Sequence, residues 1–154
     1  PNRVSTGLQA CFVFGLIPVG SERNRPESML HHISFGVRNL ALSGAFYDGA
    51  LGALGFRRVF EHETAIGYGL VDGNDLFCLK LRPDVISPGP GFHLAFAAPS
   101  RAAVHAFHES ALRVGGKDCG APGLRPAYGP HYYAAFLLDP DGYRIEAVIN
   151  EPED

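Results

Sequence analysis

Three polar residues, His32, His93 and Glu146, have the types and the placement to hold a divalent metal ion. Each stands in a segment that alternates apolar and polar residues, so we expect each on a β-strand. The alternation places each side chain opposite the apolar residues of its strand. If the apolar faces pack on helices, all three point into one concave space. Two imidazoles and a carboxylate with open coordination positions suit iron, manganese and related ions, which act as Lewis acids or orient substrate oxygens.

Taken one at a time, these residues are weak evidence for a metal site. A lone strand histidine is more often a packing residue, and Glu146 alone could be an exposed edge charge. Their joint occurrence matters because the chain repeats itself. Shifting the sequence by 61 positions, the separation of the two histidines, aligns eight identical pairs: His32/His93, Phe35/Phe96, Ala41/Ala102, Ala45/Ala106, Phe46/Phe107, Ala50/Ala111, Leu51/Leu112 and Gly55/Gly116. The sequence is therefore a duplication.

Each copy predicts the same order of elements. In the first copy a strand at 30–37 precedes a helix capped by Asn39. The predicted inward face of this helix is Leu42, Phe46, Ala50 and Leu54. Strands are then expected at 56–63, 66–71 and 76–81. In the second copy we expect a strand at 92–97, a helix after Ser100, an irregular loop at 120–130, and strands at 132–138 and 143–149. The pattern is βαβββ, twice.

Length and composition limit the class of protein. With 154 residues and 46% hydrophobic residues the chain suits one globular domain. We assign it to residues 29–154, with modules at about 29–83 and 91–150. Residues 1–28 lack the pattern of the rest, and we interpret them as a leader or vector-derived extension outside the fold. A net charge of -3 gives no reason to expect nucleic acid or a membrane as partner. Three cysteines without metal or disulfide spacing favour a cytoplasmic location.

Three segments resemble a known family. They are the strand that begins at His32, the run from Phe46-Tyr47 to Leu54-Gly55-Phe56, and the ending Asp139-Pro140-Asp141-Gly142-Tyr143-Arg144-Ile145-Glu146. Residues 29 to about 150 are similar to the vicinal-oxygen-chelate superfamily, which includes glyoxalase I, bleomycin resistance proteins and extradiol dioxygenases. The resemblance implies an α+β fold in which two βαβββ modules form a curved mixed sheet around a cavity. It also implies a homodimer and a divalent metal (Mn, Fe, Ni or Zn) bound by His32, His93 and Glu146.

One departure separates this chain from glyoxalase I, which carries a second carboxylate ligand on the last strand of the first module. The cavity-facing residues of that strand are here Cys78 and Lys80. Cys78 is expected as a small core residue, and Lys80 as a solvent-reaching or substrate-binding side chain. The three-ligand set resembles instead that of fosfomycin-resistance proteins and extradiol dioxygenases.

The loop before the strand at 132–138 supplies further candidates. Arg125 suits a carboxylate or phosphonate, and Tyr133 is a second candidate contact to a substrate. His131 and Tyr128 suit acid–base roles, with Glu146 as a further proton carrier. A surface loop rich in turn-forming residues is an equally good reading of this segment.

The sequence supports two classes of function. The first is a metal-dependent enzyme, a lyase or isomerase of the glyoxalase I-like type, acting on a small molecule with vicinal oxygens. The second is a non-catalytic drug-binding resistance protein, which would have no need of the three ligands together. An extradiol-type dioxygenase is a further alternative.

Overall fold

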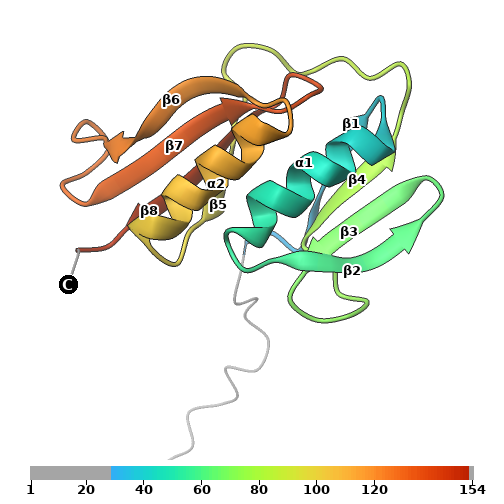
Figure 1. Ribbon diagram of the computed structural model, residues 1–154, viewed down its shortest axis with the longest axis horizontal. Coiled ribbons are helices and arrows are strands. Elements are labelled where there is room, and N and C mark those ends of the chain that lie inside the picture. The colour runs from blue at the N-terminus through green and yellow to red at the C-terminus, as the bar shows by residue number, and fades with distance from the viewer. Residues whose placement is uncertain (1–28, 153–154) are drawn as a thin grey trace, which may run out of the picture.

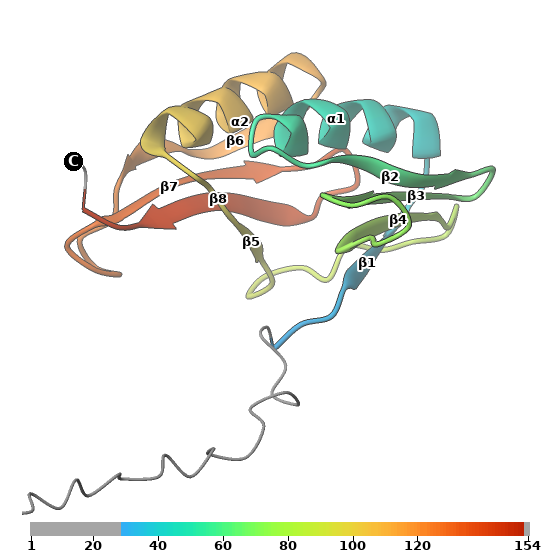
Figure 2. The same cartoon turned by 90° about the horizontal axis from the view of Figure 1, so that it is seen from below.

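The computed structural model describes residues 29–152, which form two similar halves. Two helices lie side by side in one layer and cover one face of two four-stranded sheets (Figures 1 and 2). The first half contains β1 (Ile33–Val37), α1 (Leu40–Gly52), β2 (Arg57–His62), β3 (Ala65–Gly69) and β4 (Phe77–Leu81). The second contains β5 (Leu94–Ala97), α2 (Arg101–Arg113), β6 (Lys117–Leu124), β7 (Tyr132–Leu138) and β8 (Arg144–Asn150).

The duplication is visible in the sheets. The strand order is β1-β4-β3-β2 in the first and β5-β8-β7-β6 in the second. In each, the strand before the helix pairs in parallel with the last strand, and the remaining pairs are antiparallel. This confirms the predicted fold of two βαβββ modules. The outer edges of β1 and β5 have no strand partner within residues 29–152.

Both helices begin at the predicted caps. The Asn39 side chain accepts a hydrogen bond from the Leu42 backbone N–H at 3.0 Å, and Ser100 Oγ accepts one from Ala103 N–H at 3.1 Å. The predicted inward face of α1 was wrong at Leu42, which is 47% exposed. Tyr47 is buried instead. The buried stripe thus continues through 46, 47, 50 and 51, the spacing of a helix packed on a sheet.

One prediction failed in the second module. Part of the segment expected as an irregular loop, 120–130, is strand β6, which extends through Leu124. It pairs with β7 with register shifts on both sides of Gly120. Because β6 is an edge strand, Pro122 and the glycines cost few ladder hydrogen bonds there. The other predicted strands exist, with ends that differ by up to three residues.

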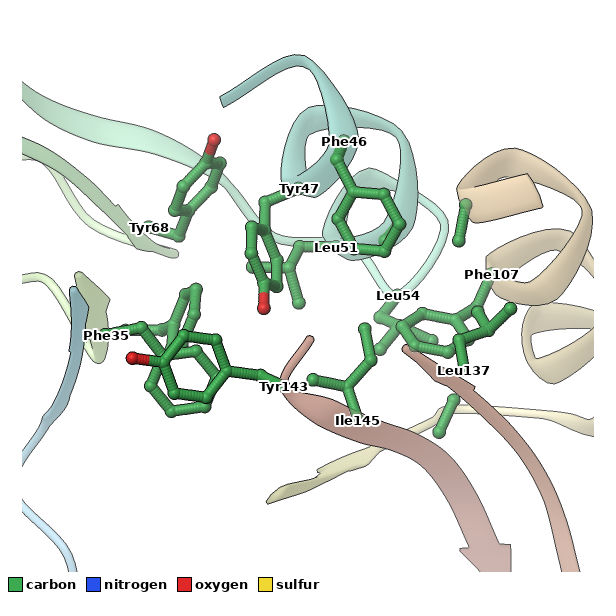
Figure 3. Close-up of a cluster of buried hydrophobic side chains, with 14 of the residues drawn as sticks. Phe35, Phe46, Tyr47, Leu51, Leu54, Tyr68, Phe107, Leu137, Tyr143 and Ile145 are labelled. Atoms are coloured by element: carbon green, nitrogen blue, oxygen red, sulfur yellow. The ribbon is translucent and has the colours of Figure 1, made fainter. Parts of the chain in front are cut away.

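A hydrophobic core runs between the helix layer and the two sheets. Phe46 and Leu51 of α1, Phe107 of α2, and Leu137 and Ile145 of the second sheet are almost completely buried (Figure 3). These side chains belong to both modules and form one cluster. Because neither sheet can bury its apolar face alone, the duplication folds as a single unit.

The acidic turn between β7 and β8 joins the modules. The Tyr47 hydroxyl donates to Asp139 Oδ2 at 2.9 Å, and the Ser43 hydroxyl donates to Asp141 Oδ2 at 2.9 Å. The Arg38 guanidinium also contacts Asp141, at 2.9 Å. Asp139 Oδ1 accepts the backbone N–H groups of Asp141 and Tyr143, and the resulting Asx turn holds the loop in shape. The same turn therefore ends one module and anchors it to the other.

Within the described residues, no helix is long and apolar enough to cross a membrane. The prediction that residues 1–28 are a leader or extension concerns a segment outside the described residues.

Candidate functional site

A buried carboxylate, Glu146, lies on the sheet face that the helices leave open. It is on β8 between Ile145 and Ala147, whose side chains enter the core. Strand alternation therefore turns Glu146 to the other face, as predicted. Its side chain is only 1% exposed. A fully buried acidic group needs a hydrogen-bond partner or a cation to compensate its lost hydration.

Two side chains contact this carboxylate. The Tyr132 hydroxyl donates a hydrogen bond of 2.6 Å to Glu146 Oε1. The Nε2 atom of His93 lies 3.5 Å from Glu146 Oε2. Burial and this hydrogen bond raise the pKa of Tyr132 to about 12, so its phenol keeps its proton and acts as a donor. The two oxygens thus differ: one is occupied by Tyr132, and the other faces the imidazole.

His93 and Glu146 lie in the wall of an open cavity of about 580 Å³, a suitable size for a small molecule. The cavity is also lined by Tyr128, Tyr132, Phe136 and Arg144. These residues come from β7, β8 and the loop before β7. The second module alone therefore supplies the cavity wall, with polar and aromatic side chains together.

The third predicted ligand, His32, is not at this cavity. It is exposed directly before β1, and its ring contacts the neighbouring His31 at 2.9 Å. Within residues 29–152, no group of three or more histidine, cysteine, aspartate or glutamate side chains lies close enough to hold a metal ion. One copy of the chain thus brings together two of the three predicted donors.

The remaining predicted site residues have mixed positions. Tyr128 lines the cavity. Arg125 does not: its guanidinium bonds to the carbonyl oxygens of Ala121 and Leu124. Tyr133 points to the helix side, where its hydroxyl contacts His105 Nε2 at 2.7 Å. His131 is exposed between the cavity loop and β7.

In the first module, Lys80 is exposed on β4, away from the cavity of the second module. Cys78 is buried, as expected for a small core residue.

Three cavity residues were not among the predicted functional side chains: Tyr132, Phe136 and Arg144. Arg144 shares the period-two parity of Glu146 and could have been found from it. Phe136 faces Glu146 across the β7–β8 ladder, which only the strand register reveals. Tyr132 was assigned to the right strand, but its contact with Glu146 depends on how far its side chain reaches.

The donors that are present fit a divalent metal ion. Glu146 has no lysine or arginine partner among the described residues, and His93 is half exposed beside its free oxygen. A neutral imidazole and an ionised carboxylate at this separation can bind one cation between them. Tyr132 would then be the outer partner that orients the carboxylate.

Comparisons with known proteins agree with this fold. The sequence model of the Glyoxalase/Bleomycin resistance protein/Dioxygenase superfamily matches residues 29–147. The chain therefore belongs to this superfamily. No curated protein matches it.

Among solved structures, a glyoxalase/bleomycin resistance protein from Albidiferax ferrireducens T118 is 33% identical, with a TM-score of 0.68. The match covers 79% of this chain and 98% of that one. A glyoxalase-related enzyme from Fulvimarina pelagi is 21% identical with a TM-score of 0.62, covering 81% and 89%. A glyoxalase I mutant from Zea mays is 21% identical with a TM-score of 0.61, covering 77% of this chain and 46% of that one. The last two show the fold alone.

Proposed function

We propose that this chain is a metal-dependent enzyme, a lyase or isomerase, acting on a small molecule with two adjacent oxygens. The metal ligands would be His93 and Glu146 of one copy and His32 of a second copy. The observation that carries the proposal is the burial of Glu146 beside His93, with no lysine or arginine side chain among residues 29–152 to balance it. A bound divalent ion would supply that balance.

The proposal of a second copy is supported by the duplication. His32 directly precedes β1, and His93 directly precedes β5. Both strands are sheet edges, so each offers unpaired backbone groups to a neighbour. If β1 of one copy lies beside β5 of the other, the two histidines enter the same space. A two-fold axis, which is the commonest symmetry of soluble oligomers, would then create two equal sites.

The chemistry divides between the ion and the protein. When bound, the metal would polarise the adjacent oxygens of the substrate and stabilise negative charge that develops on them. Tyr132 holds Glu146 Oε1, which leaves Oε2 directed toward His93. Tyr128 lines the cavity, and its hydroxyl is the group we assign to proton transfer at the substrate. His131 is a second candidate for that proton.

Metal content tests the proposal. After dialysis against manganese, iron, nickel or zinc, elemental analysis of the wild type should find about one ion per chain. His93→Ala and Glu146→Gln should lose most of it, and so should His32→Ala. His105→Ala is the matched control, because that imidazole lies on the opposite side with Tyr133 and should leave the metal content unchanged.

Two results would favour the drug-binding alternative. One is a wild-type protein that retains no stoichiometric metal. The other is metal content that survives in all three ligand variants.

A glyoxalase I-like activity is the first reaction to assay, with the hemithioacetal of methylglyoxal and glutathione as substrate. The glyoxalase-type relatives make it the natural starting point. A metal-loaded chain that leaves this substrate unchanged would redirect the search to other compounds with vicinal oxygens.

A further inference from the structure

The cavity contains one positive side chain that the proposed metal site does not use. Arg144 is on β8, two residues before Glu146, so both side chains point to the open face of the sheet. Within residues 29–152, its guanidinium forms no hydrogen bond or ion pair. Its one specific contact is with the ring of Phe136, whose centroid lies 5.0 Å from the guanidinium carbon.

This contact leaves the hydrogen-bond donors of Arg144 unused. A guanidinium over an aromatic ring is attracted by the ring, but its N–H groups keep their capacity to donate to a ligand. Arg125 stacks on the same ring at 5.6 Å and donates to the carbonyl of Ala121 at 2.6 Å. Of the two arginines, Arg125 is committed to the protein backbone, and Arg144 is available to a ligand.

Arg144 also lies where two cavities meet. It lines the 580 Å³ cavity with Glu146, and it lines a neighbouring cavity of about 380 Å³ under the linker residues Pro88–Phe92. His93 is the other residue that the two cavities share. A ligand at the His93–Glu146 pair therefore lies in a cavity that Arg144 also lines.

The aromatic side chains indicate the shape of that ligand. Tyr128 is 66% exposed and meets Tyr132 edge to face, with ring centroids 5.2 Å apart. Most of the Tyr128 side chain is therefore accessible to a flat group in the cavity. The Cα atoms of Arg144 and Glu146 are roughly 7 Å apart, the repeat of two residues along a strand. Both side chains line the same cavity, so one small molecule can contact both of them.

We propose that Arg144 binds the carboxylate of a planar substrate whose adjacent oxygens lie at the His93–Glu146 pair. The substrate class is then a small anionic molecule with a carboxylate on one side and vicinal oxygens on the other. This inference rests on the proposed function for the position of the adjacent oxygens. Charge-assisted hydrogen bonds from a guanidinium to a carboxylate give both affinity and orientation.

A matched pair of probes tests the proposal: 3,4-dihydroxybenzoate and 3,4-dihydroxybenzamide, which differ in the charge of one group. Calorimetry under anaerobic conditions should show that zinc-loaded wild type binds the benzoate roughly ten- to a hundredfold more tightly than the benzamide. Arg144→Gln should abolish this preference, whereas Arg144→Lys should keep part of it. Arg101→Gln is the control, because Arg101 also stacks on a tyrosine of β7, Tyr133, but from the helix side.

The same titrations separate this inference from the proposed function. Zinc binding is measured first, and both probes are titrated into zinc-loaded and metal-free protein. A chain that binds no zinc but prefers the benzoate through Arg144 would contradict the metal site and support the anion site. Equal affinities for the two probes in the wild type, or a preference that survives in Arg144→Gln, would overturn the role of Arg144. A preference lost in Arg125→Gln and kept in Arg144→Gln would overturn it as well.

Discussion

Replacing Asp139 by asparagine should change how the stability of the protein depends on pH. Asp139 is 3% exposed, and its burial raises the pKa from 3.8 to about 6. The hydrogen bonds from Tyr143, Tyr47 and Asp141 act in the opposite direction and do not fully offset the burial. The folded state therefore retains a proton that the unfolded chain releases at lower pH.

The sign follows from this difference in bound protons. Between about pH 4 and pH 6 the folded state holds more protons than the unfolded state, so the free energy of unfolding falls as pH rises. The difference between a pKa of 3.8 and one of about 6 corresponds to about 3 kcal/mol of unfolding free energy. This stabilisation is present below pH 4 and is lost as the pH rises above 6. Asparagine at position 139 keeps an acceptor oxygen for the two backbone N–H groups and cannot ionise. The free energy of unfolding of the variant, relative to that of the wild type, should therefore rise by about 3 kcal/mol from pH 4 to pH 7.

Urea denaturation followed by circular dichroism at several pH values measures this gain. Asp72→Asn is the control, because Asp72 is exposed and its ion pair with Arg57 lies at the surface. The difference in unfolding free energy between Asp72→Asn and the wild type should not change with pH. If the difference between Asp139→Asn and wild type is also constant from pH 4 to pH 7, burial does not control the protonation of Asp139, and the reasoning is refuted.

Three further predictions concern single side chains. Tyr132→Phe removes the hydrogen bond to Glu146 and should weaken metal binding roughly 10- to 100-fold in a competition titration; Tyr133→Phe, on the other face, should not, and equal losses would contradict an orienting role. Phe107→Ala should cost about 3–5 kcal/mol of unfolding free energy, since Phe107 is 0% exposed. Phe60→Ala, at a residue 46% exposed, should cost much less, and similar losses would argue against the assigned core. Ser100→Ala should cost about 1 kcal/mol in thermal or chemical unfolding through loss of the α2 cap, and an unchanged stability would show that the cap is dispensable.

The fold was predictable because the duplication repeats each signal. The pairing of His32 with His93 fixed the register of the two copies, and the caps Asn39 and Ser100 marked both helix starts. Strand β6 was missed because edge strands tolerate glycine and proline, which otherwise indicate loops. Leu42 was predicted to be buried because a period of four fits the apolar residues of α1. The face of α1 that packs on the sheet includes Tyr47 instead.

The candidate site was only partly predictable. The alternation of strand β8 was enough to place Glu146 on the open face, because alternation is a local property of a strand. Arg144 lies two residues earlier and faces the same side. The contact of Tyr132 with Glu146 depends on the β7–β8 register, and the separation of His32 from His93 depends on how the modules pack. Both are properties of the tertiary structure, which a single sequence does not specify.

The central claim is a metal site formed by residues of two copies, and mixing two inactive variants tests it directly. His32→Ala and Glu146→Gln are each expected to bind little metal alone. If they are mixed, unfolded and refolded together, about half of the dimers should be mixed, and each mixed dimer should contain one intact site. Metal content should then recover to about a quarter of the wild-type value. Recovery of this size supports a shared site. If the mixture binds no more metal than the separate variants, although each variant forms dimers in sedimentation experiments, the shared site is contradicted.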